Sequence, residues 1–325
     1  MRSVAVAALF TLSLTACTKA SSPPSEPPTP PQPELVARFD PAAGELPEGL
    51  VMGERAAYVG FAPTSRIVKV DPDSGAVSEF GQLPTPVAGK GFMTGLTVSS
   101  DGDVYAGLVS FVPEVQPGIY RVPKAGGAAA LFSKDAQLTF PNALAFDADG
   151  ALFATDSGSG SVFRIDPSGS ATRWSGDPAL AGNQAACDGA GPGFAIGANG
   201  IVVEPDAVYV VNLDQATLVK LPRQSDGTAG KAVVLAEPDC ETLGGADGLT
   251  RAPDGSFVIA VNRQNKVVRV SADGAVRTIV SGAPLDFPAT VAYRGNTLFA
   301  TNFAFANASA GKPATPGLLR VGETP

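Results

Sequence analysis

The stretch Ala246–Gly274 (ADGLTRAPDGSFVIAVNRQNKVVRVSADG) decides the fold class of this chain. It contains a short apolar run, a Pro-Asp-Gly turn, an alternating apolar segment, a polar turn, a second alternating segment and a final Asp-Gly turn. Apolar residues that alternate between Asp-Gly turns are typical of consecutive antiparallel strands. The stretch therefore predicts one small antiparallel sheet.

Five further copies of this pattern occur along the chain, and they begin at Pro47, Met93, Pro141, Ala198 and, in a weaker form, Pro288. Successive copies are 42 to 57 residues apart when measured between the equivalent positions Gly49, Gly95, Ala143, Gly200, Gly248 and Thr290. A period of about 40–50 residues with four strands per unit is typical of a β-propeller. We therefore predict an all-β, six-bladed β-propeller of four-stranded blades.

The two ends of the repeat region predict how the ring closes. After Pro288 only three strands are expected, at Thr290–Arg294, Thr297–Asn302 and Leu318–Val321. One spare strand, Glu34–Phe39, precedes the first copy. We expect this N-terminal strand to complete the last blade, because it would remove an open sheet edge.

The beginning of the chain predicts export. Met1–Ala16 has one Arg and then an apolar run that is too short to span a bilayer, as in a secretory signal peptide. The string Leu14-Thr15-Ala16-Cys17 resembles a bacterial lipoprotein box, which implies cleavage before Cys17 and a diacylglycerol on its sulfur. The alternative is an ordinary signal peptide followed by a chance cysteine.

Residues 17–33 are expected to form a lipidated cysteine and a tether, because the segment after Cys17 is mostly Pro, Ser and Thr. Residue 18 is Thr rather than Asp, which in such lipoproteins implies sorting to the outer membrane. We therefore expect a monomer at the bacterial cell envelope that contacts the membrane only through its lipid. Its propeller, residues 34–325, would lie in the periplasm or at the cell surface.

Composition excludes several classes of function. The net charge of −8 argues against a nucleic-acid partner, because phosphate binding needs a basic surface. The chain has no histidine, which excludes a Ser-His-Asp triad, a histidine base and a histidine-ligated zinc. Acid–base chemistry would have to come from carboxylates, Lys, Tyr or metal-bound water.

Two cysteines remain if Cys17 is lipidated, and they suit an oxidising compartment. Cys187 and Cys240 both lie in predicted loops that lead from an outer strand to the next inner strand, in consecutive blades. Such loops share one face of a propeller, so a disulfide is geometrically possible. The alternative is a pair of free buried thiols.

The repeat also predicts a group of polar side chains at one mouth of the central channel. The residues just before the inner strands are Glu48, Thr94, Asn142, Asn199, Asp247 and Ala289. Those just after the second strands include Asp156, Asn212, Asn262 and Asn302. Oxygen ligands of the first kind suit a divalent cation such as Ca²⁺, Mg²⁺ or Mn²⁺.

A turn role is the alternative for these polar residues, because Asn or Asp before Gly is common in turns. Asn199-Gly200 and Asp247-Gly248 fit that alternative, whereas Glu48-Gly49 does not, since Glu has no such preference. In a loop on the same face, Phe303-Ala304-Phe305 could form a hydrophobic lip for substrate or pack as an ordinary loop.

At these residues the chain resembles the SMP-30/gluconolactonase-like six-bladed propellers, with paraoxonases and strictosidine synthase as more distant relatives. Pro47-Glu48-Gly49, Asn199-Gly200-Ile201 and Asp247-Gly248-Leu249 stand where that family has its Glu, Asn and Asp metal ligands. Pro141-Asn142 matches a further Asn at the substrate end of the funnel. In place of the Arg that often precedes this Asn, the chain has Thr139-Phe140, which argues against sugar-acid lactones.

The resemblance implies hydrolysis of a small-molecule lactone or related ester with a divalent metal ion. Ca²⁺ is the first candidate, and Mg²⁺, Mn²⁺ or Zn²⁺ are the others. Asp247 would act as general base, Glu48 and Asn199 would complete the protein ligands, and Asn142 would orient the substrate. Asp156 and Asn212 are further candidates for substrate contact on the funnel wall.

Two classes of function therefore remain. The first is a metal-dependent hydrolase, a lactonase or esterase, anchored at the cell envelope. The second is a non-catalytic lipoprotein whose propeller binds a ligand or partner, with its polar residues as turn formers or a structural Ca²⁺ site.

Overall fold

The computed structural model describes residues 32–187 and 193–322 of the chain, together with Met1. The predicted lipidation site Cys17, nearly all of the predicted signal peptide and most of the predicted tether lie outside the described residues. Within the described part, no helix is both long and apolar enough to cross a bilayer.

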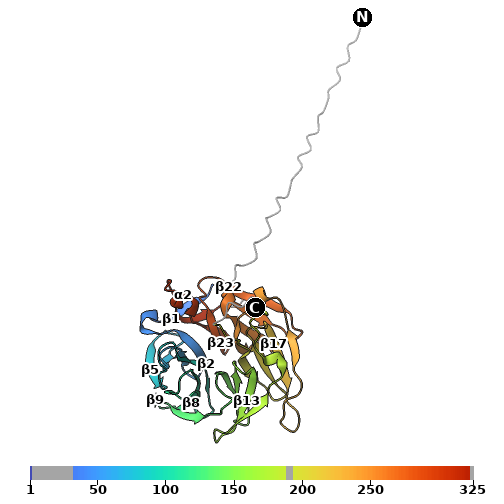
Figure 1. The fold of residues 1–325 in the computed structure, drawn as a ribbon. Helices are drawn as coiled ribbons and strands as arrows, with labels where there is room; N and C mark the ends of the chain where they lie inside the picture. Colours follow the sequence, from blue (N-terminus) through green and yellow to red (C-terminus); the bar gives the residue numbers. More distant parts are fainter. Residues whose placement is uncertain (2–31, 188–192, 323–325) are drawn as a thin grey trace.

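Six antiparallel sheets are arranged around a central axis, as Figure 1 shows. The predicted all-β, six-bladed propeller is therefore confirmed. Blade 1 consists of β2 (Pro47–Met52), β3 (Ala57–Phe61), β4 (Arg66–Val70) and β5 (Val77–Gln82), with the short strand β9 (Gly127–Ala128) added at its edge. Blade 2 consists of β6 (Gly91–Val98), β7 (Val104–Ser110), β8 (Gly118–Val122) and β10 (Ala130–Ser133). Blade 3 consists of β11 (Pro141–Phe146), β12 (Leu152–Asp156), β13 (Ser161–Ile165) and β14 (Ala171–Ser175).

Blades 4 to 6 have the same order. Blade 4 consists of β15 (Ala198–Val203), β16 (Ala207–Asn212), β17 (Thr217–Pro222) and β18 (Val233–Ala236). Blade 5 consists of β19 (Ala246–Arg251), β20 (Phe257–Val261), β21 (Lys266–Val270) and β22 (Val276–Ser281). Blade 6 consists of β23 (Pro288–Arg294), β24 (Thr297–Asn302), β25 (Gly317–Val321) and β1 (Glu34–Arg38). Helical segments are short and lie between strands: η1 (Pro41–Ala43), η2 (Pro178–Leu180), α1 (Cys240–Leu243), η3 (Asn262–Gln264) and α2 (Phe305–Ser309).

The N-terminal strand closes the ring as predicted. β1 pairs antiparallel with β25, with Glu34 opposite Arg320 and Arg38 opposite Gly317. The first blade-forming strand of the chain is thus the outer strand of the last blade, and the sixth sheet gains a fourth strand.

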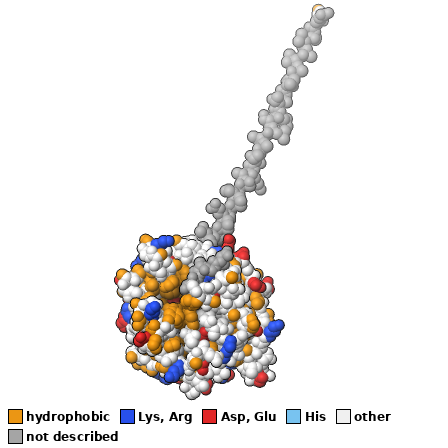
Figure 2. Space-filling view, in the orientation of Figure 1, with side chains coloured by type: hydrophobic (Ala, Val, Ile, Leu, Met, Phe, Trp, Pro, Cys, Tyr) orange, Lys and Arg blue, Asp and Glu red, His pale blue; other side chains and the backbone are white. Residues whose placement is uncertain are grey.

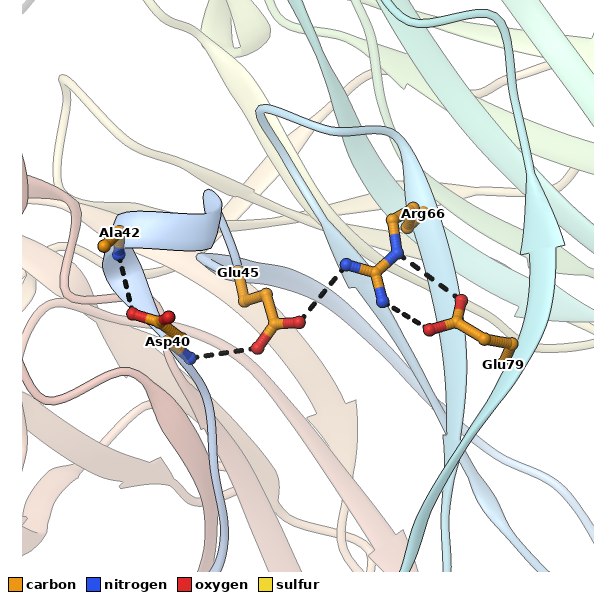
Figure 3. A network of polar contacts seen from close by, with 5 residues as sticks. All are labelled: Asp40, Ala42, Glu45, Arg66 and Glu79. Carbon is orange, nitrogen blue, oxygen red and sulfur yellow. Dashed lines mark hydrogen bonds and ion pairs between the residues drawn. The ribbon is translucent and has the colours of Figure 1, made fainter.

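A polar network fixes the connection between this closing strand and blade 1 (Figure 3). Glu45 accepts a hydrogen bond from the Asp40 backbone N–H at 3.0 Å and one from Arg66 at 3.2 Å. The guanidinium of Arg66, on β4, also binds Glu79 on β5. The chain that enters β2 is therefore tied to the outer half of the same blade.

One departure from four strands per blade occurs in blade 1. The two-residue strand β9, from the β8–β10 connection of blade 2, pairs parallel with β5. An outer strand presents unpaired backbone groups, and this short pairing covers part of that edge.

The core consists of six separate clusters, and each one fills the space between two neighbouring blades. Between blades 6 and 1, for example, Phe39 packs edge-to-face on Phe61, and Phe299 joins the same cluster. A blade buries its faces only against its neighbours, so the ring gains its stability by closing.

Candidate functional site

All six inner strands carry a β-bulge at the position that was predicted to face the axis. The ladder to the second strand shifts between Pro47 and Gly49 in blade 1 and between Ala246 and Leu249 in blade 5. Equivalent shifts occur in the other four inner strands. A bulge redirects the side chain at that point, which explains why residues inside a strand can turn toward the channel.

The glycines that follow these residues allow the inner strands to approach one another closely. A Cβ on Gly200 would lie 2.3 Å from the backbone oxygen of Asp247, and one on Gly248 would lie 2.5 Å from that of Ala289. Both glycines lie inside inner strands, and neither has a positive φ. The Asn-Gly and Asp-Gly pairs are therefore not turn formers, and the turn alternative is wrong for them.

Four of the six predicted positions line the channel at the same level. Glu48, Asn142, Asn199 and Asp247 border an inner cavity of about 170 Å³ between the inner strands. The same four residues border an outer cavity of about 370 Å³ on the face of the propeller. They therefore form the polar boundary between the two cavities.

The two remaining positions line neither cavity. The hydroxyl of Thr94 donates a 2.7 Å hydrogen bond to the carbonyl oxygen of Pro141 in the next blade. Ala289 is buried and carries no polar side-chain atom. The ring of polar residues is therefore incomplete at blades 2 and 6.

Burial makes the two carboxyls at this boundary weak acids. Burial, and then the charge of Asp247, raise the pKa of Glu48 well above its usual range. Burial also raises the pKa of Asp247 to about 7, although hydrogen bonds from Asn262 and Asn199 act in the opposite direction. Two carboxylates this poorly solvated repel each other, so the site favours a proton or a cation between them.

Asn262 holds the carboxylate of Asp247. Its Nδ2 donates a 2.9 Å hydrogen bond to Asp247 Oδ2, and its side chain is only 5% exposed. Sequence reasoning placed Asn262 at the channel mouth but did not assign it to the site. Its position after the second strand of the blade that carries Asp247 was the signal that could have identified it.

Asn142 is oriented by Ser157, which lies in the turn directly after β12. Its Nδ2 donates a 2.9 Å hydrogen bond to Ser157 Oγ, whose own hydroxyl donates to the Ala198 carbonyl at 2.7 Å. Ser157 was not singled out from the sequence, because it follows Asp156 in an ordinary turn string.

Asp156 and Asn212, the two predicted wall residues, are fully buried and line neither cavity. Asp156 accepts hydrogen bonds from the backbone N–H groups of Phe140 (2.7 Å) and Ser159 (2.8 Å). Asn212 donates to the Ala179 and Ala181 carbonyls. The structure therefore does not bring these two residues to the site but uses them to fix top-face loops.

The donor set at the boundary fits a divalent cation only if amide oxygens take part. Within residues 32–187 and 193–322, no group of three or more Cys, Asp or Glu side chains could hold a metal ion. Two carboxylates and two amides are nevertheless present, and Glu48 Oε2 is buried without a hydrogen-bond partner in the described structure. A bound cation would supply the missing partner for a buried carboxylate oxygen of this kind.

The wall of the outer cavity is apolar. Figure 2 shows hydrophobic side chains gathered on the face that carries α2. Those that line the cavity are Phe92, Phe140, Ile196, Leu213, Phe287, Phe303 and Phe305. The predicted role of Phe303 and Phe305 as a hydrophobic lip therefore agrees with their position.

The predicted disulfide is present on the same face. Cys187 and Cys240 are bonded, with their Cα atoms 5.4 Å apart. The bond joins the loop that leads to Asn199 with helix α1, which precedes Asp247. The alternative of two free thiols is thus excluded.

No family model and no curated protein matches the chain in sequence. Solved structures with a similar fold include the aldose sugar dehydrogenase of Streptomyces coelicolor in its PQQ-bound form (19% identity, 90% of this chain and 99% of that chain covered, TM-score 0.63). They also include a calcium-binding protein, regucalcin, from Agrobacterium tumefaciens (17%, 90% and 94%, TM-score 0.62) and a proposed gluconolactonase (15%, 90% and 94%, TM-score 0.61). The structural neighbours therefore include regucalcin- and gluconolactonase-like propellers, as the resemblance predicted.

Proposed function

We propose that this protein is a hydrolase of a lactone or related ester, with a divalent cation held by Glu48, Asn199 and Asp247. The observation that carries the proposal is the pair of buried carboxylates at the floor of an apolar cavity, one of which has an oxygen without a partner among the described residues. Similar propellers named as a calcium-binding regucalcin and a proposed gluconolactonase support the choice of cation and substrate. Their fold alone does not select an activity, since another similar propeller is a sugar dehydrogenase.

When bound, a divalent cation would polarise the carbonyl of the substrate and lower the pKa of nearby water. Glu48 and Asp247 would supply its charged ligands and Asn199 a neutral oxygen. Ca²⁺ is the first candidate, because carboxylate and amide oxygens are the donors it prefers. Burial is the main cause of the raised pKa of Glu48, and binding would relieve the further contribution from repulsion by Asp247.

Asp247 is the proposed general base. It would accept a proton from the attacking water and return it to the alkoxide that leaves when the ring ester opens, so that a lactone and water give a hydroxy acid. The 2.9 Å hydrogen bond from Asn262 fixes the orientation of this carboxylate. A base must lie in a fixed geometry to contribute, and this bond supplies that constraint.

Asn142 is the proposed substrate-orienting residue. It borders both cavities and is held by Ser157, so its amide is fixed at the level of the two carboxylates. An amide in this position can donate to or accept from the ester group without adding charge.

The test compares the wild-type protein with Glu48→Gln and Asp247→Asn in metal analysis and in a screen of lactones and aryl esters. We expect stoichiometric divalent metal in the wild type, and both substitutions should lower metal affinity by at least about tenfold. Glu79→Gln, in the exposed pair with Arg66, is the matched control and should retain the metal.

Two results would reject parts of the proposal. If the metal-bound wild type hydrolyses no compound in the panel, the alternative of a non-catalytic propeller that binds a ligand or partner is favoured. Equal metal content in wild type and both variants would remove the proposed ligands altogether.

We also propose that the protein is lipid-anchored at Cys17 in the cell envelope. The support is the string Leu14-Thr15-Ala16-Cys17 and the Pro-rich segment after it, both outside the described residues. Mass spectrometry of the protein from a membrane fraction should find a diacylglycerol adduct on Cys17. An unmodified, soluble product with an N-terminus other than Cys17 would contradict the proposal.

A further inference from the structure

The outer cavity is walled by aromatic rings on two opposite sides. Phe140 directly precedes β11 in blade 3, and Phe287 directly precedes β23 in blade 6. Blades 3 and 6 lie opposite each other in a ring of six, with two blades between them on either side. Phe140 and Phe287 therefore line the outer cavity from opposite sides of the axis. Both occur in a Phe-Pro string at the same register of the repeat, and both line the cavity that the polar boundary also borders.

Each of these two phenylalanines belongs to a larger aromatic group. On one side Phe140 contacts Phe92 and Phe194 at ring-centroid distances of 5.6 and 5.9 Å. On the other side Phe287 lies 6.1 Å from both Phe303 and Phe305, which stack on each other at 5.3 Å. Phe305 is 45% exposed, so this wall continues from the cavity to the surface.

The backbone beneath the second group is held in unfavourable conformations. Phe287 has φ of +53° and Ala304 has φ of +57°, a region that bulky residues rarely adopt. The Phe287 N–H is fixed by Asn265 Oδ1 at 2.7 Å, and the Ala304 N–H by the Asp286 carbonyl at 2.7 Å. Strain of this kind, imposed by surrounding bonds, is typical of sites that must present a side chain to a ligand.

A buried carboxylate makes the same wall rigid. Asp286 accepts hydrogen bonds from Asn307 Nδ2 on α2 and from the Thr315 backbone N–H, both at 2.9 Å. The segment that carries Phe303 and Phe305 is therefore attached at both ends. The apolar wall exists before any ligand binds.

The charges around the cavity do not suit an anionic ligand. Arg263 is the one cationic side chain among its lining residues, and its guanidinium is paired with Asp214 at 3.3 Å. No other side chain that lines this cavity carries a positive charge that could pair with a carboxylate on the substrate.

We infer that the substrate carries an uncharged hydrophobic arm, an alkyl or aryl substituent, that lies between the two phenylalanine groups while its ester reaches the polar floor. The ester group of this substrate rests on the proposed hydrolysis. The hydrophobic arm is inferred from the lining of the outer cavity alone. A cavity of about 370 Å³ with this lining is of the size and character that bind small apolar molecules.

The test measures binding of ketones, which cannot be hydrolysed, to the full chain as purified. Isothermal titration calorimetry would compare a hexyl-substituted cyclopentanone with cyclopentanone. We expect the hexyl compound to bind at least about tenfold more tightly, since burial of two methylene groups already gives that factor. Phe303→Ala and Phe305→Ala should each remove most of this difference, whereas Phe305→Leu should retain part of it.

Val233→Ala, which removes an exposed apolar side chain from outer strand β18, is the control and should leave the selectivity unchanged. Equal affinity for the two ketones in the wild type would overturn the inference. So would selectivity that survives both alanine substitutions, because the arm would then lie elsewhere.

Hydrolysis separates this inference from the proposed function. If the hexyl ketone binds selectively but neither γ-decanolactone nor γ-butyrolactone is hydrolysed, the apolar site stands and the hydrolase proposal fails. If both lactones are hydrolysed with equal kcat/KM and the ketones bind equally, the hydrolase stands and the hydrophobic arm is rejected. Preference for glucono-δ-lactone over γ-decanolactone would also reject the arm.

Discussion

Asn262 Nδ2 lies 2.9 Å from Asp247 Oδ2, and this bond distinguishes blade 5 from its neighbours. Asn212 in blade 4 is the last residue of β16 and pairs with Ala198, as Val261 pairs with Ala246 in blade 5, so it lies one register position before Asn262. It donates to the backbone carbonyls of a top-face loop. Asn302 in blade 6 does the same, to the carbonyls of Pro284 and Thr315. The last residue of the second strand thus fixes a loop in blades 4 and 6, whereas the residue after that strand fixes a carboxylate in blade 5.

Asn262→Ala should therefore impair the proposed hydrolysis without disturbing the ring. We expect a fall of about 10–100-fold in kcat/KM, as is usual when a group that orients a reacting residue is removed. The acid limb of the pH–rate profile should move to higher pH, because the hydrogen bond lowers the pKa of Asp247.

Asn212→Ala is the matched control for that substitution. It should lower the free energy of unfolding by about 1–3 kcal/mol, since two backbone carbonyls lose their donor. Its pH–rate profile should match that of the wild type. A shift of equal size in both variants would show that Asn262 does not act through Asp247.

The stability of the metal-free protein should depend on pH through Asp247. Burial raises the pKa of this carboxyl to about 7, whereas an unfolded Asp titrates at about 3.9. The folded state therefore holds a proton that the unfolded chain has released. The resulting contribution to stability is fully present below about pH 4 and is lost as the pH rises through about 7.

Asp247→Asn removes that loss. In buffer with chelator, urea unfolding should find the variant more stable than the wild type at about pH 8, by up to a few kcal/mol at roughly 1.4 kcal/mol per pKa unit. The difference should shrink at about pH 4, and excess Ca²⁺ should reverse it at about pH 8. A wild type as stable as the variant in chelator at about pH 8 would argue against a buried, proton-binding Asp247.

Gly200→Ala should separate blades 4 and 5 near the axis. A Cβ there would lie 2.3 Å from the Asp247 backbone oxygen, so the strands must move apart or shift register. We expect a loss of roughly 1–3 kcal/mol in the free energy of unfolding, together with weaker metal binding. Gly158→Ala is the control, since its nearest contact would be an ordinary 3.5 Å, and it should have little effect on either quantity.

The disulfide should contribute to stability more than to chemistry. Cys187 and Cys240 are 53 residues apart in the sequence. A disulfide typically raises the free energy of unfolding by about 2–4 kcal/mol. The double substitution to Ser should lower the thermal midpoint and abolish its sensitivity to reductant. Reductant that destabilises the double variant as much as the wild type would contradict this assignment.

The sequence by itself determined the propeller, its six blades and its closure by the N-terminal strand. These features follow from local information: alternating apolar residues, Asp-Gly turns and a period that repeats along the chain. It also placed Glu48, Asn142, Asn199 and Asp247 at one register, because every copy of a repeat carries its inner strand at the same point.

Only the tertiary structure decided how the polar residues around the channel mouth are used. Thr94 turns to the next blade and Asp156 and Asn212 bind loops, while Asn262 reaches Asp247. The glycines after Glu48, Asn199 and Asp247 serve close approach between strands rather than turns. Each of these roles depends on a partner far away in the chain or on a neighbouring strand at the axis. A repeat pattern marks the positions that can face the channel, but it does not show which of them will meet such a partner.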